Sequence, residues 1–511
     1  MKEAEPKTWL ISKLDTLGSR GTTWLIALIM LSVVWLWIAP LGASLWLDET
    51  GTYWVIEEGL SRISSRAAAT PHPSLYYFIA GLAVALGGAS EALLRLPSVI
   101  AMALAAFLLY RLGKRLLDQE AALLATLVFV GWKEVAFAAA DARPYAVGLL
   151  VVIAAMLLLI RWLETGRRAD GLGYTLLASL TVYIHYLFAA MFLVHTIYAI
   201  HRLRARPPVR LMAVCGAGIL SAALVLPLLP HVLFLARNGA RYSFVGKPWL
   251  PQLLEFFSPP ILVSSILIGL LLACFVRPAY HFSKPLANPA PLLLLVSWAA
   301  APPLLLWAVS ILTPARVFVG RYALCAVPGL ALLAGWALRA IAPAHKRLLV
   351  ASSLTLGSLI CFAPFRGGSF VHGNEDWRQA MQTVRSITGT TRTPVLLRTG
   401  LVEAPLPDSP SQPLRLDYYC SAPLSMYPAG GRVISLPYWF DPKAQEYLER
   451  LASEILQPAD RFLFVSRTET GAFPAWLEGR FAGRFTSKPL GNFGLISVIL
   501  FERRPGNPGP P

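Results

Sequence analysis

The stretch that decides the fold is WLIALIMLSVVWLWIAPLG at residues 24–42, followed closely by Trp46-Leu47-Asp48-Glu49-Thr50. The apolar run is long enough to cross the ~30 Å hydrocarbon layer of a bilayer as a helix. It is also longer than the hydrophobic region of an ordinary signal peptide, so we interpret it as a retained anchor. Because ionisable residues near the hydrocarbon boundary cost free energy, the pair Asp48-Glu49 marks a candidate working site.

The composition is that of a membrane protein with a polar part attached. Of the 511 residues, 56% are hydrophobic and only 14% are charged, whereas soluble domains average about 25% charged residues. The net charge of +17 does not indicate nucleic acid, because Lys and Arg fall mostly in short loops between apolar runs. The five cysteines show no paired spacing, which indicates neither a disulfide framework nor a zinc site.

We predict a mainly α-helical, polytopic membrane bundle of eleven spans. They lie at residues 22–42, 95–112, 120–139, 144–162, 172–186, 188–201, 210–234, 257–276, 290–312, 322–340 and 347–364. A further apolar run, Pro73–Ala89, is short and rich in glycine. If it does not cross, nineteen Lys and Arg lie inside and ten outside; if it crosses, the split becomes twelve and seventeen. The positive-inside rule therefore favours an interfacial helix on the outer face.

A small α/β domain is predicted at residues 365–511, after the membrane domain at residues 1–364. Short strand-like runs (Pro394–Arg398, Arg432–Pro437, Arg461–Ser466 and Leu495–Phe501) alternate there with helical patterns at Asp376–Ile387 and Pro442–Leu456. An odd number of spans places this domain outside the membrane. The chain contains neither an internal repeat nor a nucleotide-binding glycine motif.

Asp48 is the strongest catalytic candidate, with Glu49 beside it. A carboxylate in this position can take the proton of a hydroxyl group as that hydroxyl attacks. Partial burial raises the pKa of an Asp toward this task. The alternative interpretation is an acidic pair that ends a helix in headgroup water.

Several residues on the predicted outer face are candidates for substrate binding. Basic residues that remain there despite the topological bias suit an anionic ligand, and the arginine fork matches phosphate. The alternatives are structural roles, surface ion pairs and attraction to anionic headgroups. The candidates are His72, Arg95, Asp141, Arg143, His185, Tyr186, Arg237, Arg241, Lys247, Arg316, Arg321 and Tyr322.

Five short motifs occur in a characteristic order: Leu47-Asp48-Glu49, His72-Pro73-x-Leu75-Tyr76-Tyr77, Leu94-Arg95-Leu96-Pro97-Ser98, Asp141-Ala142-Arg143-Pro144-Tyr145 and Arg321-Tyr322. In this order they resemble the protein O-mannosyltransferase superfamily, which includes bacterial transferases that add aminoarabinose to lipid A. The resemblance covers roughly residues 22–340. The more usual His-Pro-Pro of the family is His72-Pro73-Ser74 here.

The resemblance implies the C-type fold of membrane glycosyltransferases and an inverting reaction with a polyprenyl-phosphate-linked sugar as donor. Asp48 would match the base of the first outer loop. Arg95, Arg143 and Arg321 would match residues that bind substrate. The resemblance fixes neither the sugar nor the acceptor, which is a protein, lipid A or another envelope glycan or lipid.

From these observations we expect a multi-pass glycosyltransferase of the bacterial inner membrane, with its site and C-terminal domain facing the periplasm. No nucleotide or redox cofactor is expected, and the spacing of Asp48 and Asp141 gives no support for a divalent metal. Two alternatives stay open. A lipid-phosphate or solute transporter would show paired, broken helices in two related halves. A scaffold would depend on its C-terminal domain and not on Asp48.

Overall fold

The computed structural model describes residues 17–68, 70, 72–205, 207–237, 245–276, 281–282, 290–366, 369–389, 392–401, 421–467 and 471–505. The chain divides into two compact units. The helical unit contains residues 1–41, 72–76 and 95–366. The mixed unit contains residues 42–71, 77–94 and 367–511.

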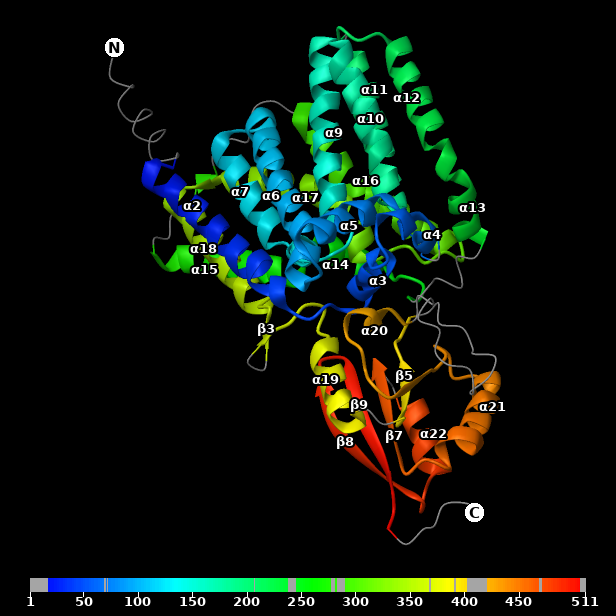
Figure 1. Ribbon diagram of the computed structural model, residues 1–511. Coiled ribbons are helices and arrows are strands. Elements are labelled where there is room, and N and C mark those ends of the chain that lie inside the picture. Colours follow the sequence, from blue (N-terminus) through cyan, green and yellow to red (C-terminus); the bar gives the residue numbers. More distant parts are fainter. Residues whose placement is uncertain are drawn as a thin grey trace, which may run out of the picture. The chain divides into compact units, whose positions relative to one another are not determined.

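Helices build almost all of the helical unit (Figure 1). The first, α2 (Ser19–Ser32), continues through a π-helical turn and a 3-10 turn to Gly42. The others are α6 (Glu91–Leu116), α7 (Gln119–Gly131), α8 (Lys133–Ala139), α9 (Tyr145–Thr165), α10 (Arg168–Ile184), α11 (Met191–Arg204), α12 (Leu211–Val225), α13 (Leu229–Arg237), α14 (Leu250–Phe257), α15 (Pro260–Val276), α16 (Ala290–Leu312), α17 (Val327–Arg339) and α18 (Ala344–Cys361). Short strands are β1 (His281–Phe282), β2 (Ile341–Ala342) and β3 (Phe365–Arg366).

Every predicted span falls on one of these helices or on two consecutive ones, but the helices differ in length. Six helices in the described part of the chain are long and apolar enough to cross a membrane, and eight if each bent pair counts as one. The bent pairs are α7 with α8, at 70°, and α14 with α15, at 47°. The chain is thus a multi-pass, mainly helical protein as expected, while the number eleven stays a prediction.

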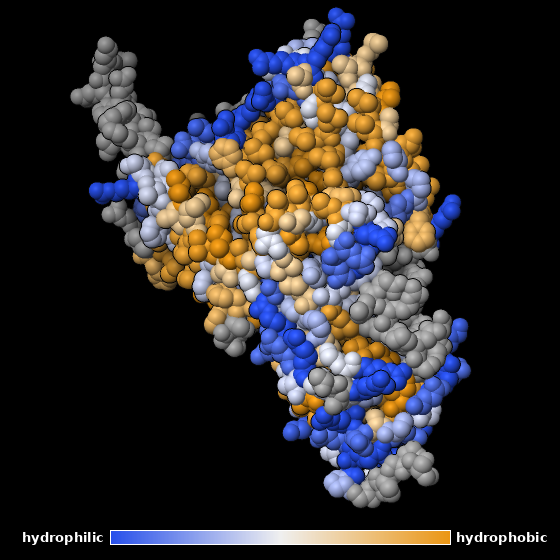
Figure 2. Space-filling view, in the orientation of Figure 1, coloured by the Kyte–Doolittle hydropathy of each residue, from blue (hydrophilic) through white to orange (hydrophobic). Residues whose placement is uncertain are grey.

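The helical unit is apolar on the outside as well as inside. Its core joins side chains of most of its helices, among them Trp37, Met102, Phe129 and Trp298. Large apolar side chains such as Phe107 and Leu271 are exposed, and Figure 2 shows that hydrophobic residues cover most of its visible face. A helix bundle that is apolar on its surface is adapted to lipid.

The mixed unit combines the loop after Leu41 with the C-terminal domain. The loop forms α3 (Leu47–Ile56) and α4 (Ile63–Ala67), and the run predicted to be interfacial forms α5 (Leu75–Gly87). At 1.5 Å per residue, α5 is about 20 Å long, too short for the ~30 Å hydrocarbon layer. Unlike the expected division at residue 364, this one places residues 42–71 with the C-terminal domain.

A five-stranded mixed sheet forms the centre of the C-terminal domain, in the order β6-β5-β7-β9-β8 (Figure 1). The strands are β5 (Pro394–Arg398), β6 (Arg432–Ser435), β7 (Arg461–Arg467), β8 (Phe485–Phe493) and β9 (Ile496–Arg503), and a two-residue strand, β4 (Ser369–Phe370), precedes them. β5 pairs in parallel with β6 and β7, whereas β9 is antiparallel to β7 and β8. The predicted small α/β domain is thereby confirmed.

Helices cover both faces of this sheet, which explains its nearly continuous hydrophobic strands. Apolar side chains of α21 (Pro442–Leu451) and α22 (Ala472–Arg480) share one core with Leu396, Phe462 and Phe464 of the strands. α19 (Trp377–Thr388) packs against β8 and β9. The short α20 (Ala422–Met426) packs against α3.

Candidate functional site

Arg143 and His72 form the centre of a basic cluster in the helical unit. Arg143 lies in the turn between α8 and α9, is 2% exposed, and approaches His72 with its Nη2 at 2.5 Å from Nε2. A guanidinium has no acceptor, so His72 must accept this hydrogen bond through an unprotonated Nε2. Burial and then the charge of Arg143 hold the pKa of His72 well below its ordinary value. His72 is therefore a neutral acceptor that orients Arg143.

His185 lies beside this pair, inside a cage of aromatic rings. It stands at the break between α10 and the turn Tyr186–Ala190 and is 4% exposed. Its ring centroid is 5.3 Å from that of Tyr145, 4.9 Å from Phe188 and 5.5 Å from Tyr322. Neither ring nitrogen has a hydrogen-bond partner among the described residues. A buried imidazole in this state is suited to a polar group of a ligand.

Arg321 adds a second guanidinium to the cluster. It belongs to the 3-10 turn Gly320–Tyr322, and its guanidinium carbon lies 5.5 Å from the ring centroid of Tyr322. The charges of Arg143 and Arg321 both contribute to the lowered pKa of His72, so both guanidinium groups act on the same imidazole. The structure thus brings together five predicted residues, which we call the basic cluster: His72, Arg143, His185, Arg321 and Tyr322.

Tyr186 was predicted to bind substrate, whereas two other residues near the cluster, His231 and Glu134, were not predicted. Tyr186 lies 2.7 Å from Nδ1 of His231, hydroxyl to ring nitrogen, and His231 also contributes to the electrostatics of His72. Sequence reasoning missed His231, although a histidine after Pro230 near the end of an apolar run was a usable signal. It also missed Glu134, whose Oε1 would lie 3.1 Å from a side chain added at Gly320, next to Arg321.

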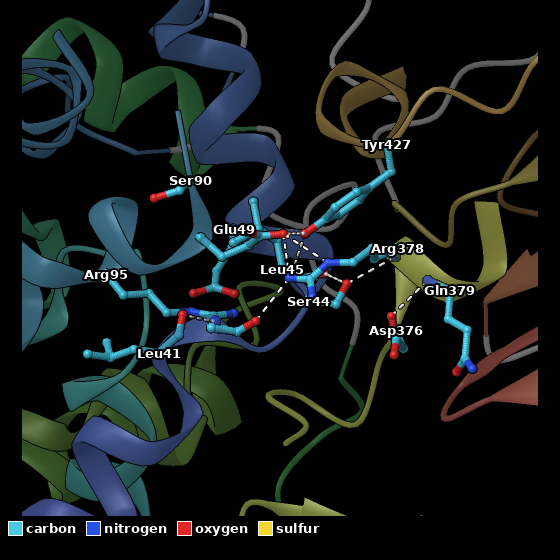
Figure 3. A network of polar contacts seen from close by, with 12 residues as sticks. Leu41, Ser44, Leu45, Glu49, Ser90, Arg95, Asp376, Arg378, Gln379 and Tyr427 are labelled. Carbon is cyan, nitrogen blue, oxygen red and sulfur yellow. Dashed lines mark hydrogen bonds and ion pairs between the residues drawn. The ribbon is translucent and has the colours of Figure 1, made fainter. Parts of the chain in front are cut away.

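Arg95 and Arg316, both predicted to bind substrate, make structural contacts with helix ends. Arg95 is fully buried and donates to the carbonyl oxygens of Pro40 and Leu41 at 3.1 and 3.0 Å (Figure 3). Arg316 donates to the carbonyl oxygens of Ser310 and Thr313 at the end of α16. Helix ends leave carbonyl groups without intrahelical partners, and these arginines satisfy them.

The other predicted binding residues differ in their relation to the basic cluster, and one of them, Asp141, contacts Arg143. Arg237 and Lys247 are exposed. Arg241 lies outside the described residues. Asp141 is fully buried in the turn before α9, where its carbonyl oxygen accepts the backbone N–H of Arg143 at 2.8 Å.

In the mixed unit, Asp48 and Glu49 lie in the first turn of α3 and differ in environment. Glu49 is fully buried, and its carboxylate accepts the N–H of Trp46, which precedes the helix, at 3.2 Å. This contact is one half of a capping box, so Glu49 has a structural role at the start of the helix. Asp48 is partly exposed, as a group that must reach a substrate has to be.

The C-terminal domain holds the segment that leads to Asp48 (Figure 3). Arg378 donates through Nη2 to the carbonyl of Gly42 at 3.0 Å and through its backbone N–H to Ser44 Oγ at 3.1 Å. The hydroxyl of Tyr427 accepts the N–H of Leu45 at 2.9 Å and donates to Glu91 at 2.9 Å. Arg378 also pairs with Glu91 at 2.5 Å, which closes the network.

Comparison with known proteins agrees with this architecture. Residues 71–231 match the dolichyl-phosphate-mannose-protein mannosyltransferase family. ArnT from Cupriavidus metallidurans in the apo state superimposes with a TM-score of 0.55 at 11% identity, over 94% of this chain and 98% of that one. The chain has the C-type glycosyltransferase fold. The same enzyme bound to undecaprenyl phosphate gives a TM-score of 0.56 at 12% identity, with the same coverage of both chains.

The family match over residues 71–231 and the C-type fold both agree with the superfamily resemblance of the five motifs. The matched family region contains His72, Arg95, Asp141, Arg143, His185 and Tyr186. It does not contain Asp48 or Arg321. No curated protein sequence matches the chain.

Proposed function

We propose that this C-type protein is an inverting glycosyltransferase that moves a sugar from a polyprenyl phosphate to an acceptor hydroxyl at the periplasmic side of a bacterial inner membrane. The observation that carries the proposal is the basic cluster, in which two guanidinium groups and two histidines lie together. A phosphate ester fits this cluster because arginine binds phosphate oxygens in bidentate fashion. His185 offers the same ligand a ring nitrogen that has no hydrogen-bond partner in the described part of the chain.

Asp48 is the base in this proposal. The acceptor oxygen attacks the anomeric carbon from the face opposite the phosphate, and its proton passes to the Asp48 carboxylate. The bond between the anomeric carbon and the phosphate oxygen breaks, and the electron pair leaves with the polyprenyl phosphate. Arg143 and Arg321 stabilise the negative charge on that leaving group.

The chain itself supports a common side of the membrane for these groups. Arg95 of α6 holds the carbonyls of Pro40 and Leu41, and Ser98 of the same helix donates to the carbonyl of Arg143 at 3.4 Å. Asp48 follows Leu41 by seven residues. Seven residues extend at most about 25 Å, which is less than the ~30 Å hydrocarbon thickness.

The test is the change Asp48→Asn in the purified full-length protein. Polyprenyl phosphates that carry aminoarabinose, mannose or glucose are offered with lipid A and envelope extracts, and release of free polyprenyl phosphate is followed by mass spectrometry. Loss of the base is expected to lower turnover about 10²- to 10⁴-fold, without loss of undecaprenyl phosphate binding. Near-normal turnover would rule out Asp48 as the base.

Glu58→Gln is the matched control. Glu58 lies in the same outer loop, is half exposed and pairs with Arg66. The Arg66 side chain is buried, but it also pairs with Glu57 at 2.6 Å and so keeps an ionic partner when Glu58 is changed. This variant is therefore expected to keep the turnover of the unaltered protein. A transporter would instead move the lipid without releasing free polyprenyl phosphate, so the same assay separates the two functions.

A further inference from the structure

Glu375 is a buried carboxylate that binds the outer loop from the C-terminal domain. It is fully buried and lies two residues before α19. Its Oε2 accepts the backbone N–H of Leu47 at 3.0 Å and the indole N–H of Trp377 at 2.8 Å. Its Oε1 accepts Nε of Arg467 at 2.5 Å. All four residues belong to the mixed unit.

The contact with Leu47 acts on the helix that carries the proposed base. Leu47 is the first residue of α3 and Asp48 is the second. The N–H groups of the first turn of a helix have no intrahelical acceptor, and a carboxylate there also interacts favourably with the helix dipole. Glu375 therefore fixes both the position and the direction of the turn from which Asp48 projects.

Glu375 contacts the sheet at the carboxyl end of β7, where its carboxylate binds Arg467. Strands β5 and β7 run in parallel and end at Arg398 and Arg467. Nη1 of Arg398 donates to the carbonyl of Arg467 at 3.2 Å, which joins the two strand ends. In α/β sheets this carboxyl edge is where ligands usually bind. At this edge Arg467 binds Glu375, and Glu375 in turn binds Leu47, which precedes Asp48.

We propose that Glu375 is a positioning residue for the transfer reaction, and that the C-terminal domain is an obligatory part of the active site. The inference rests on the proposed function in so far as Asp48 is the base. Glu375 touches no substrate. It acts through Leu47 by holding the Asp48 carboxylate in the orientation needed for proton transfer.

The change Glu375→Gln tests this with almost no change of volume. If the amide oxygen faces Leu47 and Trp377, the amide N–H groups face Arg467, which has only donors. If the amide is flipped, its N–H groups face the donors of Leu47 and Trp377. Either orientation breaks part of the network. Adding Arg467→Met removes the conflict, because the amide oxygen can then accept from Leu47 again.

We expect Glu375→Gln to lower kcat about 10- to 100-fold, since small misplacements of a catalytic group have effects of this size. KM for the sugar-carrying polyprenyl phosphate that the unaltered protein uses best is expected to stay within about twofold, because the phosphate is held by other residues. Hydrogen exchange of the peptide that spans residues 45–50 is expected to speed up. Adding Arg467→Met should restore both exchange and much of kcat.

The control is Glu449→Gln, which removes an exposed ion pair with Arg480 in the same domain and should change neither measurement. Unchanged kcat and exchange in Glu375→Gln would overturn the positioning role, whatever Asp48→Asn does. Faster exchange with a normal kcat would also overturn the positioning role. The same holds if the double variant recovers normal exchange but regains no turnover. An active Asp48→Asn overturns the base assignment instead, so the two failures are distinguishable.

Discussion

Replacing Gly373 with alanine is expected to displace Trp46 and lower both stability and turnover. Gly373 has φ of +65°, a conformation that costs an L-residue about 1–2 kcal/mol. An added Cβ would lie 2.6 Å from Cβ and 2.7 Å from Cγ of Trp46. Overpacking of this kind typically costs about 1–3 kcal/mol. Trp46 immediately precedes α3, so the clash acts two residues before Asp48.

Gly483→Ala is the matched control, because it isolates the steric part. Gly483 has φ of +80°, yet nothing lies within 4 Å of an added Cβ. Both variants carry the free-energy cost of an alanine at positive φ, and only Gly373→Ala adds the clash with Trp46. The remaining difference of about 1–3 kcal/mol corresponds to a five- to 150-fold change in the fraction of molecules with Trp46 in place.

The assay is thermal unfolding of the full-length protein in detergent, together with release of polyprenyl phosphate. Gly373→Ala should unfold at a lower temperature than Gly483→Ala and turn over at least about fivefold more slowly. Gly483→Ala should keep near-normal turnover. Equal melting temperatures and equal turnover in the two variants would refute the packing of Gly373 against Trp46, and with it the argument that the C-terminal domain shapes the start of α3.

Two further predictions concern His72 and Tyr427. Because the pKa of His72 is lowered in the folded chain, unfolding takes up a proton below pH ~6.5, and stability should fall with decreasing pH by at most about 1.4 kcal/mol per unit. His72→Gln keeps a neutral hydrogen-bond acceptor for Arg143 and should reduce that slope. An unchanged slope would contradict the neutral state of His72. Tyr427→Phe leaves the buried N–H of Leu45 without its acceptor, which costs about 1–3 kcal/mol. Lower thermal stability and faster exchange at residues 43–48 are expected, and no change in either would show that the contact is unimportant.

The sequence predicts those parts of the fold that depend on local pattern. Long apolar runs mark the helices, and the strands β5 and β7 begin at the residues that their hydrophobic runs indicate. β8 was missed, because Lys488, Pro489 and Gly491 interrupt its alternation and the strand contains an irregularity at that point. The 70° bend between α7 and α8 was also missed, although Gly131 and the charged pair Lys133-Glu134 interrupt the apolar run at that point.

The candidate site was predictable by residue type but not by role. Arg143, Arg321 and His185 were expected to bind substrate together, and the structure does bring them together. Arg95 has the same sequence signature, yet its guanidinium satisfies carbonyl groups 54 and 55 residues away in the chain. The hold of Glu375 on Leu47 spans 328 residues. Contacts of that range leave no local pattern, so the sequence alone does not place the loop of residues 42–71 with the C-terminal domain.

The strand order of the C-terminal sheet has a consequence for biosynthesis. β9 is the last strand to be made, yet it lies between β7 and β8, so the sheet cannot close until residue 503 has emerged. Asp48 is synthesised some 455 residues earlier. At 5–20 residues per second the delay is about 25–90 s. Once Arg321 has been made, the nascent protein carries Asp48 and the arginines of the basic cluster, but it still lacks the sheet edge that holds the segment before Asp48. A ribosome-bound or prematurely terminated chain is therefore expected to be catalytically silent.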